Sequence, residues 1–311
     1  MLSDKVKEMY RVDSKNEKLW KLMGRGVKED DDLSSFLKDS LKDYNPKDIK
    51  AIFNAKGANN SHQFEMADLL HRRKYLLLTL LRNGHVKTKL PFVVEFTGTP
   101  RSGKSTTIHN LKRFFEKAGF KVHVIEELTT SKFYKNSILP LKETMSLGEY
   151  NLLILNTAFD QLKEAVQGDF DIVLIDRGIN DRQIWNYIRL NSDDLTMEEF
   201  SNAAETYSKF SKEWINTLVV LKADSMISIQ RDYISTLYLE PRRFNNKDNI
   251  DTFNNAMREV QEFHESSVTN FASIDTDHIS LITTCMIVAN IILDNMIKYF
   301  ILDDIIPEDE E

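Results

Sequence analysis

A run of eight residues that begins at Gly98 combines the residue types that hold phosphate groups. It reads Gly-Thr-Pro-Arg-Ser-Gly-Lys-Ser and fits the pattern G-x-x-x-x-G-K-[ST] in full. The glycines allow a tight loop whose backbone N–H groups point at phosphate oxygens, and the helix start that follows adds partial positive charge. Lys104 can reach the β and γ phosphates, and the Ser105 hydroxyl is a ligand for Mg²⁺. We predict a nucleoside triphosphate site, with ATP expected and GTP as the alternative, made of Gly98, Thr99, Pro100, Arg101, Ser102, Gly103, Lys104, Ser105 and Thr106.

Two other β-prone runs end in acids that could serve this site. Glu126 and Glu127 follow the second run, and the carboxyl ends of parallel strands border the ligand crevice. Either could take a proton from an acceptor hydroxyl, with Glu127 the better candidate, or both could form a solvated pair in a loop. Asp176-Arg177 ends the third run in the form of a Walker B element. We expect Asp176 to hold Mg²⁺ together with Ser105, and Arg177 to bind phosphoryl or acceptor oxygens.

Residues further along the chain could border an acceptor or cover the nucleotide. Asp181, Arg182 and Trp185 fall on the helix predicted after the third run, where a purely structural role is nearly as good an explanation. Arg231, Arg242 and Arg243 flank a polar segment, Asp232 to Asn254, that contains few apolar residues. That segment could close over ATP and bring arginines to the developing charge, or it could be an exposed basic loop.

The elements that must position these residues alternate along the chain. Five β-prone runs are separated by segments long enough for helices, and they cover residues 92–96, 121–125, 171–175, 217–221 and 270–274. This alternation predicts an α/β fold with a parallel five-stranded sheet flanked by helices. Together with the phosphate-binding motif it predicts a P-loop NTPase fold. The helix after the motif should end at Gly119.

The first 88 residues have a different pattern. Leu33, Phe36, Leu37 and Leu41 share one helical face, and further helical stretches lie on either side of them. We therefore divide the chain into a helical N-terminal region, residues 1–88, and a P-loop α/β domain, residues 89–311. The helical region could cover the sheet domain, mediate self-association or bind a protein partner.

The amino-acid composition narrows the classes of protein that remain possible. Of the 311 residues 48 are acidic and 41 basic, and this excess of acids argues against a general nucleic-acid binder. Cys285 is the one cysteine, which fits a reducing compartment, and the N-terminus lacks the apolar run of a signal peptide. The long apolar region 281–302 contains Asn290 and Asp294, so we expect a buried helix instead of a membrane span. The histidines and the cysteine show no spacing typical of metal ligands. From the single cysteine and the N-terminal pattern we expect a cytoplasmic protein.

Taken together, these residues resemble the P-loop nucleoside and nucleotide monophosphate kinases, in particular thymidylate kinase and the deoxynucleoside kinases. The resemblance covers about residues 90 to 300, and only the phosphate-binding motif in it is specific. It implies that Glu127 lies near the acceptor hydroxyl or phosphate, and that Asp176-Arg177 is the motif that handles Mg²⁺ and the acceptor. It also implies that Asp181 and Asn156 lie near positions that some members use to bind the base.

The sequence departs from the family at two places next to these residues. Leu128 follows Glu127 where the family usually has proline, and Gly178 follows Arg177 where it usually has tyrosine or serine. These differences bear on the acceptor more than on the chemistry.

The function that we predict is transfer of the γ-phosphate of Mg-ATP to a small acceptor, with a nucleoside or nucleotide as the leading candidate. Lys104, Arg177, Arg231 and Arg242 would stabilise charge, and Glu127 would act as the base. The residues expected to contact the acceptor are Glu126, Asn156, Asp181 and Arg182.

Two alternatives remain at this point. One is a kinase that acts on a polynucleotide end, in which the N-terminal helices and Arg72-Arg73-Lys74 form the groove. The other is an ATPase or switch module that acts through a protein partner.

Overall fold

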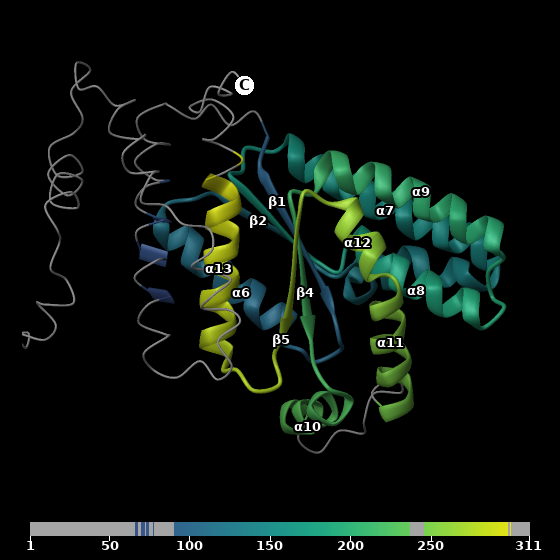
Figure 1. The fold of residues 1–311 in the computed structure, drawn as a ribbon. Coiled ribbons are helices and arrows are strands. Elements are labelled where there is room, and N and C mark those ends of the chain that lie inside the picture. Colours follow the sequence, from purple (N-terminus) through teal and green to yellow (C-terminus); the bar gives the residue numbers. More distant parts are fainter. Residues whose placement is uncertain are drawn as a thin grey trace, which may run out of the picture.

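The computed structural model describes residues 66–67, 70–71, 73–74, 77, 90–236, 246–297 and 299. The predicted N-terminal helices, apart from seven residues between 66 and 77, lie outside this part of the chain, and so does Arg242. Within it, five parallel strands form one sheet in the order β2-β3-β1-β4-β5 (Figure 1). The strands are β1 (Phe92–Gly98), β2 (Val122–Ile125), β3 (Ile172–Asp176), β4 (Thr217–Lys222) and β5 (Asn270–Asp275). Each of the five predicted runs is a strand, so the predicted fold is confirmed.

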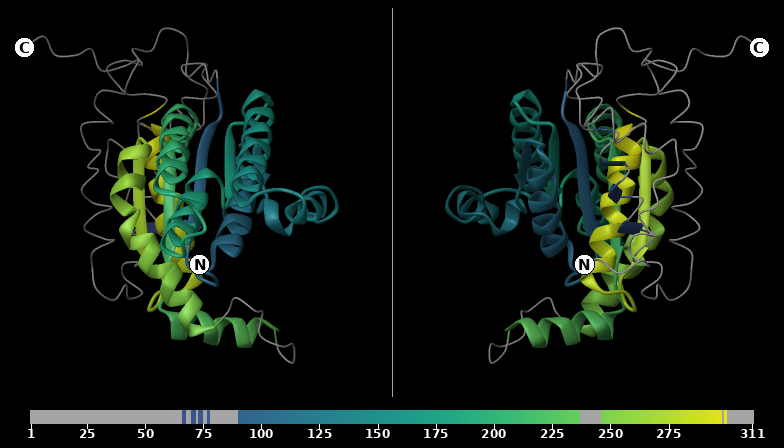
Figure 2. Two further views of the ribbon diagram at one scale, coloured as in Figure 1. Left: turned by 90° about the vertical axis from the view of Figure 1, so that its right-hand side faces the viewer. Right: turned by 90° about the vertical axis from the view of Figure 1, so that its left-hand side faces the viewer.

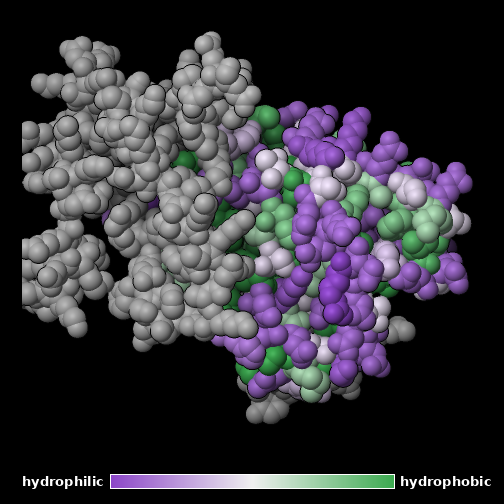
Figure 3. All heavy atoms as spheres, viewed as in Figure 1, coloured by the Kyte–Doolittle hydropathy of each residue, from purple (hydrophilic) through white to green (hydrophobic). Residues whose placement is uncertain are grey.

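Helices cover both faces of the sheet, as parallel sheets require. In Figure 1 α6 and α13 lie on one side, whereas α7, α8, α9 and α12 lie on the other. The helices are α6 (Lys104–Ala118), α7 (Leu147–Gln167), α8 (Ile179–Asn191), α9 (Met197–Trp214), α10 (Ser225–Thr236), α11 (Lys247–Glu259), α12 (Gln261–Ser267) and α13 (Leu281–Ile297). The outer surface that includes α11 and α12 is largely hydrophilic (Figure 3).

The residues of the central strand β1 alternate between two separate cores. Phe92, Val94 and Phe96 pack in a cluster with α6 and α13, whereas Val93 belongs to the cluster formed with α7, α8 and α9. This alternation follows from the two-residue period of a strand. Because all seven residues of β1 are buried, any polar side chain on it has to find a partner inside the protein.

Local signals in the sequence set the ends of the helices. Gly119 ends α6 in the left-handed conformation with φ 100°, as predicted. Ser146 and Thr196 begin α7 and α9, each in a capping box with a glutamate three residues later. Between β2 and α7 lie three short helical turns, η1 (Leu128–Thr130), η2 (Tyr134–Ile138) and η3 (Leu139–Glu143). Figure 2 shows this segment standing out from the body of the domain.

The described residues before position 88 pack directly against the α/β core. Arg73 donates a hydrogen bond to Asn290 of α13 at 3.0 Å, and Asn290 donates one to the Met66 carbonyl at 2.9 Å. Met66 and Leu77 are buried in the same cluster as α6 and α13. The polar residues of α13 are thus used in packing, as expected for a buried helix. In the described part of the chain, no helix has the length and apolar character needed to cross a membrane.

Candidate active site

The phosphate-binding motif forms a tight loop between β1 and α6. Gly98 has φ 129°, and a Cβ at this position would lie 2.0 Å from the Leu221 carbonyl oxygen of β4. The Thr99 N–H donates to that same oxygen at 3.0 Å, so the loop starts pressed against the neighbouring strand. Gly103 precedes α6 with φ 98°. Both glycines therefore adopt backbone conformations that other residues rarely take.

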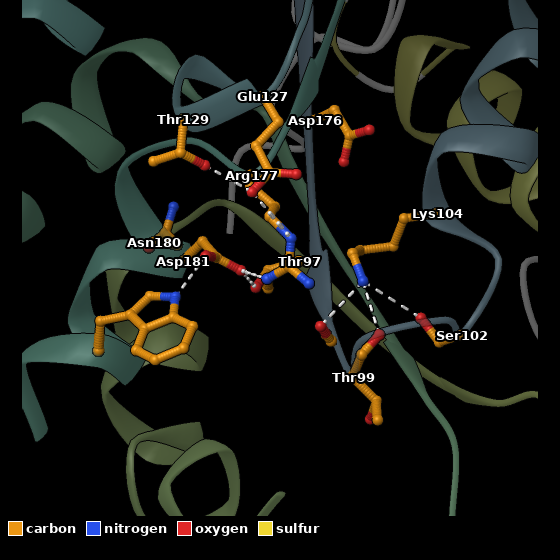
Figure 4. Close-up of polar contacts among 12 residues, drawn as sticks. Thr97, Thr99, Ser102, Lys104, Glu127, Thr129, Asp176, Arg177, Asn180 and Asp181 are labelled. Atoms are coloured by element: carbon orange, nitrogen blue, oxygen red, sulfur yellow. Dashed lines mark hydrogen bonds and ion pairs between the residues drawn. The ribbon is translucent and has the colours of Figure 1, made fainter. Parts of the chain in front are cut away.

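Lys104 lies buried inside this loop (Figure 4). Its ammonium group donates to the carbonyl oxygens of Gly98 and Thr99 at 2.9 and 2.7 Å, and to the Ser102 hydroxyl at 3.4 Å. Burial, and then the nearby Arg177 guanidinium, lower the pKa of Lys104 to about 7. A phosphate chain in the loop would supply the negative charge that this buried amine lacks.

Ser105 and Asp176 meet at the start of α6, as the sequence predicts for a magnesium site. The Ser105 hydroxyl donates to Asp176 Oδ2 at 2.5 Å. The other carboxylate oxygen, Oδ1, is buried without a hydrogen-bond partner, and burial raises the pKa of Asp176. A hydroxyl beside an unsatisfied carboxylate oxygen fits a hard cation that takes its remaining ligands from phosphate and water. No group of three or more His, Cys, Asp or Glu side chains is arranged to hold a metal within the described residues.

Arg177 connects the two acids that the sequence assigns to the acceptor. Its Nη1 donates to Asp181 Oδ1 at 2.8 Å, and its Nε lies 3.8 Å from Glu127 Oε1 (Figure 4). Arg177 has φ 59°, a left-handed conformation, and its N–H donates to the Phe96 carbonyl oxygen at 2.9 Å. Thr129 Oγ1 donates to Glu127 at 2.8 Å. A non-glycine residue held at positive φ costs free energy that the surrounding contacts have to offset.

Asp181 is the most constrained acid of this group. Besides Arg177, it accepts hydrogen bonds from Thr97 Oγ1 at 2.6 Å and from Trp185 Nε1 at 3.2 Å. Burial alone would raise the pKa of Asp181, but Arg177 and Thr97 outweigh burial and hold it below the usual value. Asp181 is therefore an ionised, fully bonded carboxylate, suited to positioning its neighbours and not to accepting a proton.

The phosphate loop, Glu127, Arg177 and Asp181 all line one cleft. Its volume of about 780 Å³ is typical of sites for small molecules. One side, the phosphate-loop side, is formed by residues 100–107. The other, which we name the α8 side, is formed by residues of η1 to α8. Its members are Glu127, Thr129, Thr130, Tyr134, Lys142, Tyr150, Ile154, Arg177, Asp181, Arg182, Trp185 and Arg189.

Polar contacts tie α10, which carries Arg231, to the phosphate loop. Arg101 forms an ion pair with Asp232 at 2.5 Å, and Ser228 donates to the Pro100 carbonyl oxygen at 2.5 Å. Arg231 lines the cleft, where its guanidinium donates to the carbonyl oxygen of Thr276 at 2.6 Å and to its hydroxyl at 2.9 Å. Arg231 is thus held at the cleft by the segment that follows β5.

The structure brings most of the predicted site residues together, but not all. Glu126 is exposed and does not line the cleft, whereas its neighbour Glu127 does. Asn156 is exposed on α7 and also lies off the cleft, because the preceding Leu155 occupies the face that packs on the sheet.

The cleft also contains residues that the sequence reasoning did not single out. Arg189 lies on the same face of α8 as Arg182, seven residues earlier, and this spacing could have identified it. Tyr134 and Tyr150 share a hydrogen bond of 2.6 Å between their hydroxyls. They come from separate elements, so no local pattern could have paired them.

Comparison with known proteins gives matches among solved structures only, since neither a family model nor a curated protein matches the sequence. The structure of deoxyadenosine kinase from M. mycoides with bound dATP is 16% identical, with a TM-score of 0.47, over 64% of this chain and 98% of that one. The structure of thymidylate kinase from Candida albicans is 15% identical, with a TM-score of 0.47, over 67% and 93%. These neighbours are kinases of the kind that the sequence resembles. The fold itself is established by the strand order and the phosphate loop.

Proposed function

We propose that this protein is a P-loop kinase that transfers the γ-phosphate of Mg-ATP to a small acceptor, a nucleoside or nucleotide. One observation carries the proposal: the phosphate loop shares a single cleft with a carboxylate, Glu127, and a partly buried arginine, Arg177. A loop that served ATP hydrolysis alone would not need an aromatic and cationic chamber beside it.

In this proposal each residue has a role that its surroundings support. The loop N–H groups and Lys104 bind the phosphates, and Arg177 stabilises charge that develops on the transferred group. Glu127 lies beside Arg177 and is partly exposed, and among the described residues its carboxylate accepts a single hydrogen bond, from Thr129; these features would let it take the proton of an acceptor hydroxyl. Bound between Ser105 and Asp176, Mg²⁺ would neutralise phosphate charge during transfer.

The charges on the α8 side favour an acceptor that is itself anionic. Arg177 is paired with Asp181 and lies near Glu127, whereas Arg182 and Lys142 line the cleft without an ion pair to any described residue. Arg189 is partly buried, and burial followed by repulsion from Arg182 lowers its pKa. An acceptor phosphate would relieve this repulsion, so a nucleoside monophosphate is favoured over a nucleoside.

A screen with ATP labelled at the γ-phosphate tests the proposal. Nucleosides, nucleoside monophosphates, oligonucleotides and no acceptor would be compared under identical Mg²⁺. We expect label in a small product, most rapidly with a monophosphate. Release of labelled phosphate alone would favour an ATPase, and label on an oligonucleotide end would favour the polynucleotide kinase. Against the latter, Arg73, part of the basic cluster that a nucleic-acid groove would need, is 3% exposed and bonded to Asn290.

A further inference from the structure

A glutamate lies in the middle of the central strand, where an apolar residue would be expected. Glu95 of β1 is 0% exposed and points to the face of the sheet that α8 covers. A buried carboxylate is costly unless donors surround it, so its presence here calls for a specific arrangement of partners.

Those partners are the first N–H groups of α8. The Asn180 and Asp181 N–H groups donate to Glu95 Oε1 at 2.7 and 3.2 Å, and the Asn180 side-chain amide donates to Oε2 at 2.9 Å. The residue before the helix, Gly178, supplies no side-chain cap. Glu95 therefore caps the N-terminus of α8 from a neighbouring strand, a role that normally belongs to the residue just before the helix.

Gly178 makes this contact possible. A Cβ at Gly178 would lie 2.8 Å from Glu95 Cδ and 2.9 Å from Ile175 Cγ2, closer than real Cβ contacts. The glycine that stands where the resembled family usually has tyrosine or serine thus leaves room for a carboxylate that approaches from β1. The two residues form one structural unit.

The arrangement extends behind the helix through neutral groups. The Asn180 side-chain oxygen accepts from Ser211 of α9 at 3.3 Å, and its carbonyl oxygen accepts from His264 Nε2 of α12 at 3.0 Å. Burial lowers the pKa of His264 to about 4, so the imidazole is neutral near pH 7. The charged groups that face Glu95 are therefore those of the site, Asp181 first and Arg177 beyond it.

The same strand holds Asp181 at two points. Glu95 binds its backbone N–H, and Thr97, two residues along the same face of β1, donates to its carboxylate. Asp181 in turn accepts hydrogen bonds from Arg177 and Trp185, and Figure 4 shows Asn180 next to this group. We propose that Glu95 is a positioning residue, which fixes the first turn of α8 and thereby the orientation of Arg177 toward the phosphate loop. This role rests on the proposed kinase function, but the contacts that define it can be tested without any turnover.

The indole N–H of Trp185 reports the position of Asp181 directly. The chain has three tryptophans, so the ¹H–¹⁵N spectrum has few indole signals, and W185F assigns the one of interest. Burial raises the pKa of Glu95 to about 7 against the opposing effect of its donors. We expect the Trp185 signal of the wild-type protein to titrate between pH 5.5 and 8.5, and to move and become insensitive to pH in E95Q. Lys104 also titrates near pH 7, so K104A, which should keep the titration, is a necessary control.

Kinase turnover provides the second readout. E95Q should bind Mg-ATP within twofold of the wild-type affinity, because the phosphate loop is intact, but its kcat should fall about tenfold or more at unchanged KM for ATP. The matched control is N186A, which removes the hydrogen bond from a buried amide of α8 to Tyr207. It should lower stability without changing the Trp185 signal or kcat.

Two results would overturn the proposal. One is an E95Q protein that keeps the wild-type Trp185 titration. The other is an E95Q protein that shifts the signal of Trp214, the last residue of α9, as much as that of Trp185, because an equal shift would indicate a general change of the fold and not a local change at Asp181. If E95Q does not fold, G178A displaces the same carboxylate by steric contact, and an unchanged Trp185 signal in that variant would be equally decisive. Failure of every acceptor in the kinase assay would leave the Trp185 result intact, so loss of the proposed function is distinguishable from loss of this inference.

Discussion

The two sides of the cleft are built in different ways. The phosphate-loop side is one continuous stretch whose shape is set by backbone, with Gly98 and Gly103 at positive φ. The α8 side collects single side chains from η1, η2, η3, α7 and α8 and from the residues that follow β2 and β3, and it holds them through partly buried contacts such as Arg177 to Asp181. The first suits a ligand part that many proteins share, namely a triphosphate. The second suits the part of the ligand that differs among enzymes, namely the acceptor. Substitution of a single side chain can alter this side without altering the rest of it.

The largest effect should come from the phosphate-loop side. K104A removes the ammonium that balances phosphate charge, and we expect turnover to fall about 10²–10³-fold, with weaker Mg-ATP binding by calorimetry. K117A changes an exposed lysine in the last turn of the same helix and is the matched control. If K104A binds and turns over ATP like K117A, the phosphate loop does not do what its shape indicates.

On the α8 side, adjacent glutamates allow a sharp comparison. E127Q removes the carboxylate beside Arg177, and we expect kcat to fall about 10²-fold or more, while Mg-ATP affinity stays near the wild-type value. E126Q changes an exposed residue off the cleft and should retain wild-type kcat. Equal losses in both variants, measured by initial rates, would show that neither glutamate acts as the base.

The buried carboxylate behind α8 predicts a dependence of stability on pH. The pKa of Glu95 in the folded protein, about 7, exceeds its ordinary 4.5, so the folded state binds the proton more tightly than the unfolded state. Stability from this group is therefore present below pH 4.5 and is lost as pH rises to 7, by roughly 3 kcal/mol. Denaturant unfolding of wild-type protein and E95Q from pH 4.5 to 8 should show the wild type losing stability relative to E95Q. A constant difference would contradict this.

The smallest effect concerns acceptor charge. R182Q removes a cation that has no ion pair to a described residue, so it should fold normally and raise KM for a monophosphate acceptor about tenfold, equivalent to ~1.4 kcal/mol. KM for the corresponding nucleoside should change little. R113Q, on an exposed position of α6, controls for loss of charge alone. A similar rise for both acceptors would place Arg182 at the base or sugar instead of a phosphate.

The contrast between the two sides also explains what the sequence could predict. The five strands and the phosphate loop follow from local patterns: β-prone runs, and a motif whose residues are contiguous. The sequence favoured Glu127 over Glu126 but could not decide which of them faces the cleft, because that depends on the direction in which the turn η1 leaves β2. Arg189 could have been predicted, because a spacing of seven residues places it on the same helical face as Arg182.

Glu95 was not predictable in its role. A charged residue in a buried strand is a visible anomaly, but its partners are 85 and 86 residues away, on a helix that only the fold brings next to it. Asn156 was suggested by the family resemblance alone, and it lies on the exposed face of α7. The helical period decides which side chains of α7 face inward, and alignment with a family motif does not.

The most direct test of the account is transfer of labelled phosphate from γ-labelled Mg-ATP to nucleoside monophosphates, with wild-type protein and K104A side by side. We predict a labelled nucleoside diphosphate with the wild-type protein and none with K104A. Tight Mg-ATP binding with no labelled product from any nucleoside or nucleotide would contradict the claim that the two sides of the cleft form one kinase site.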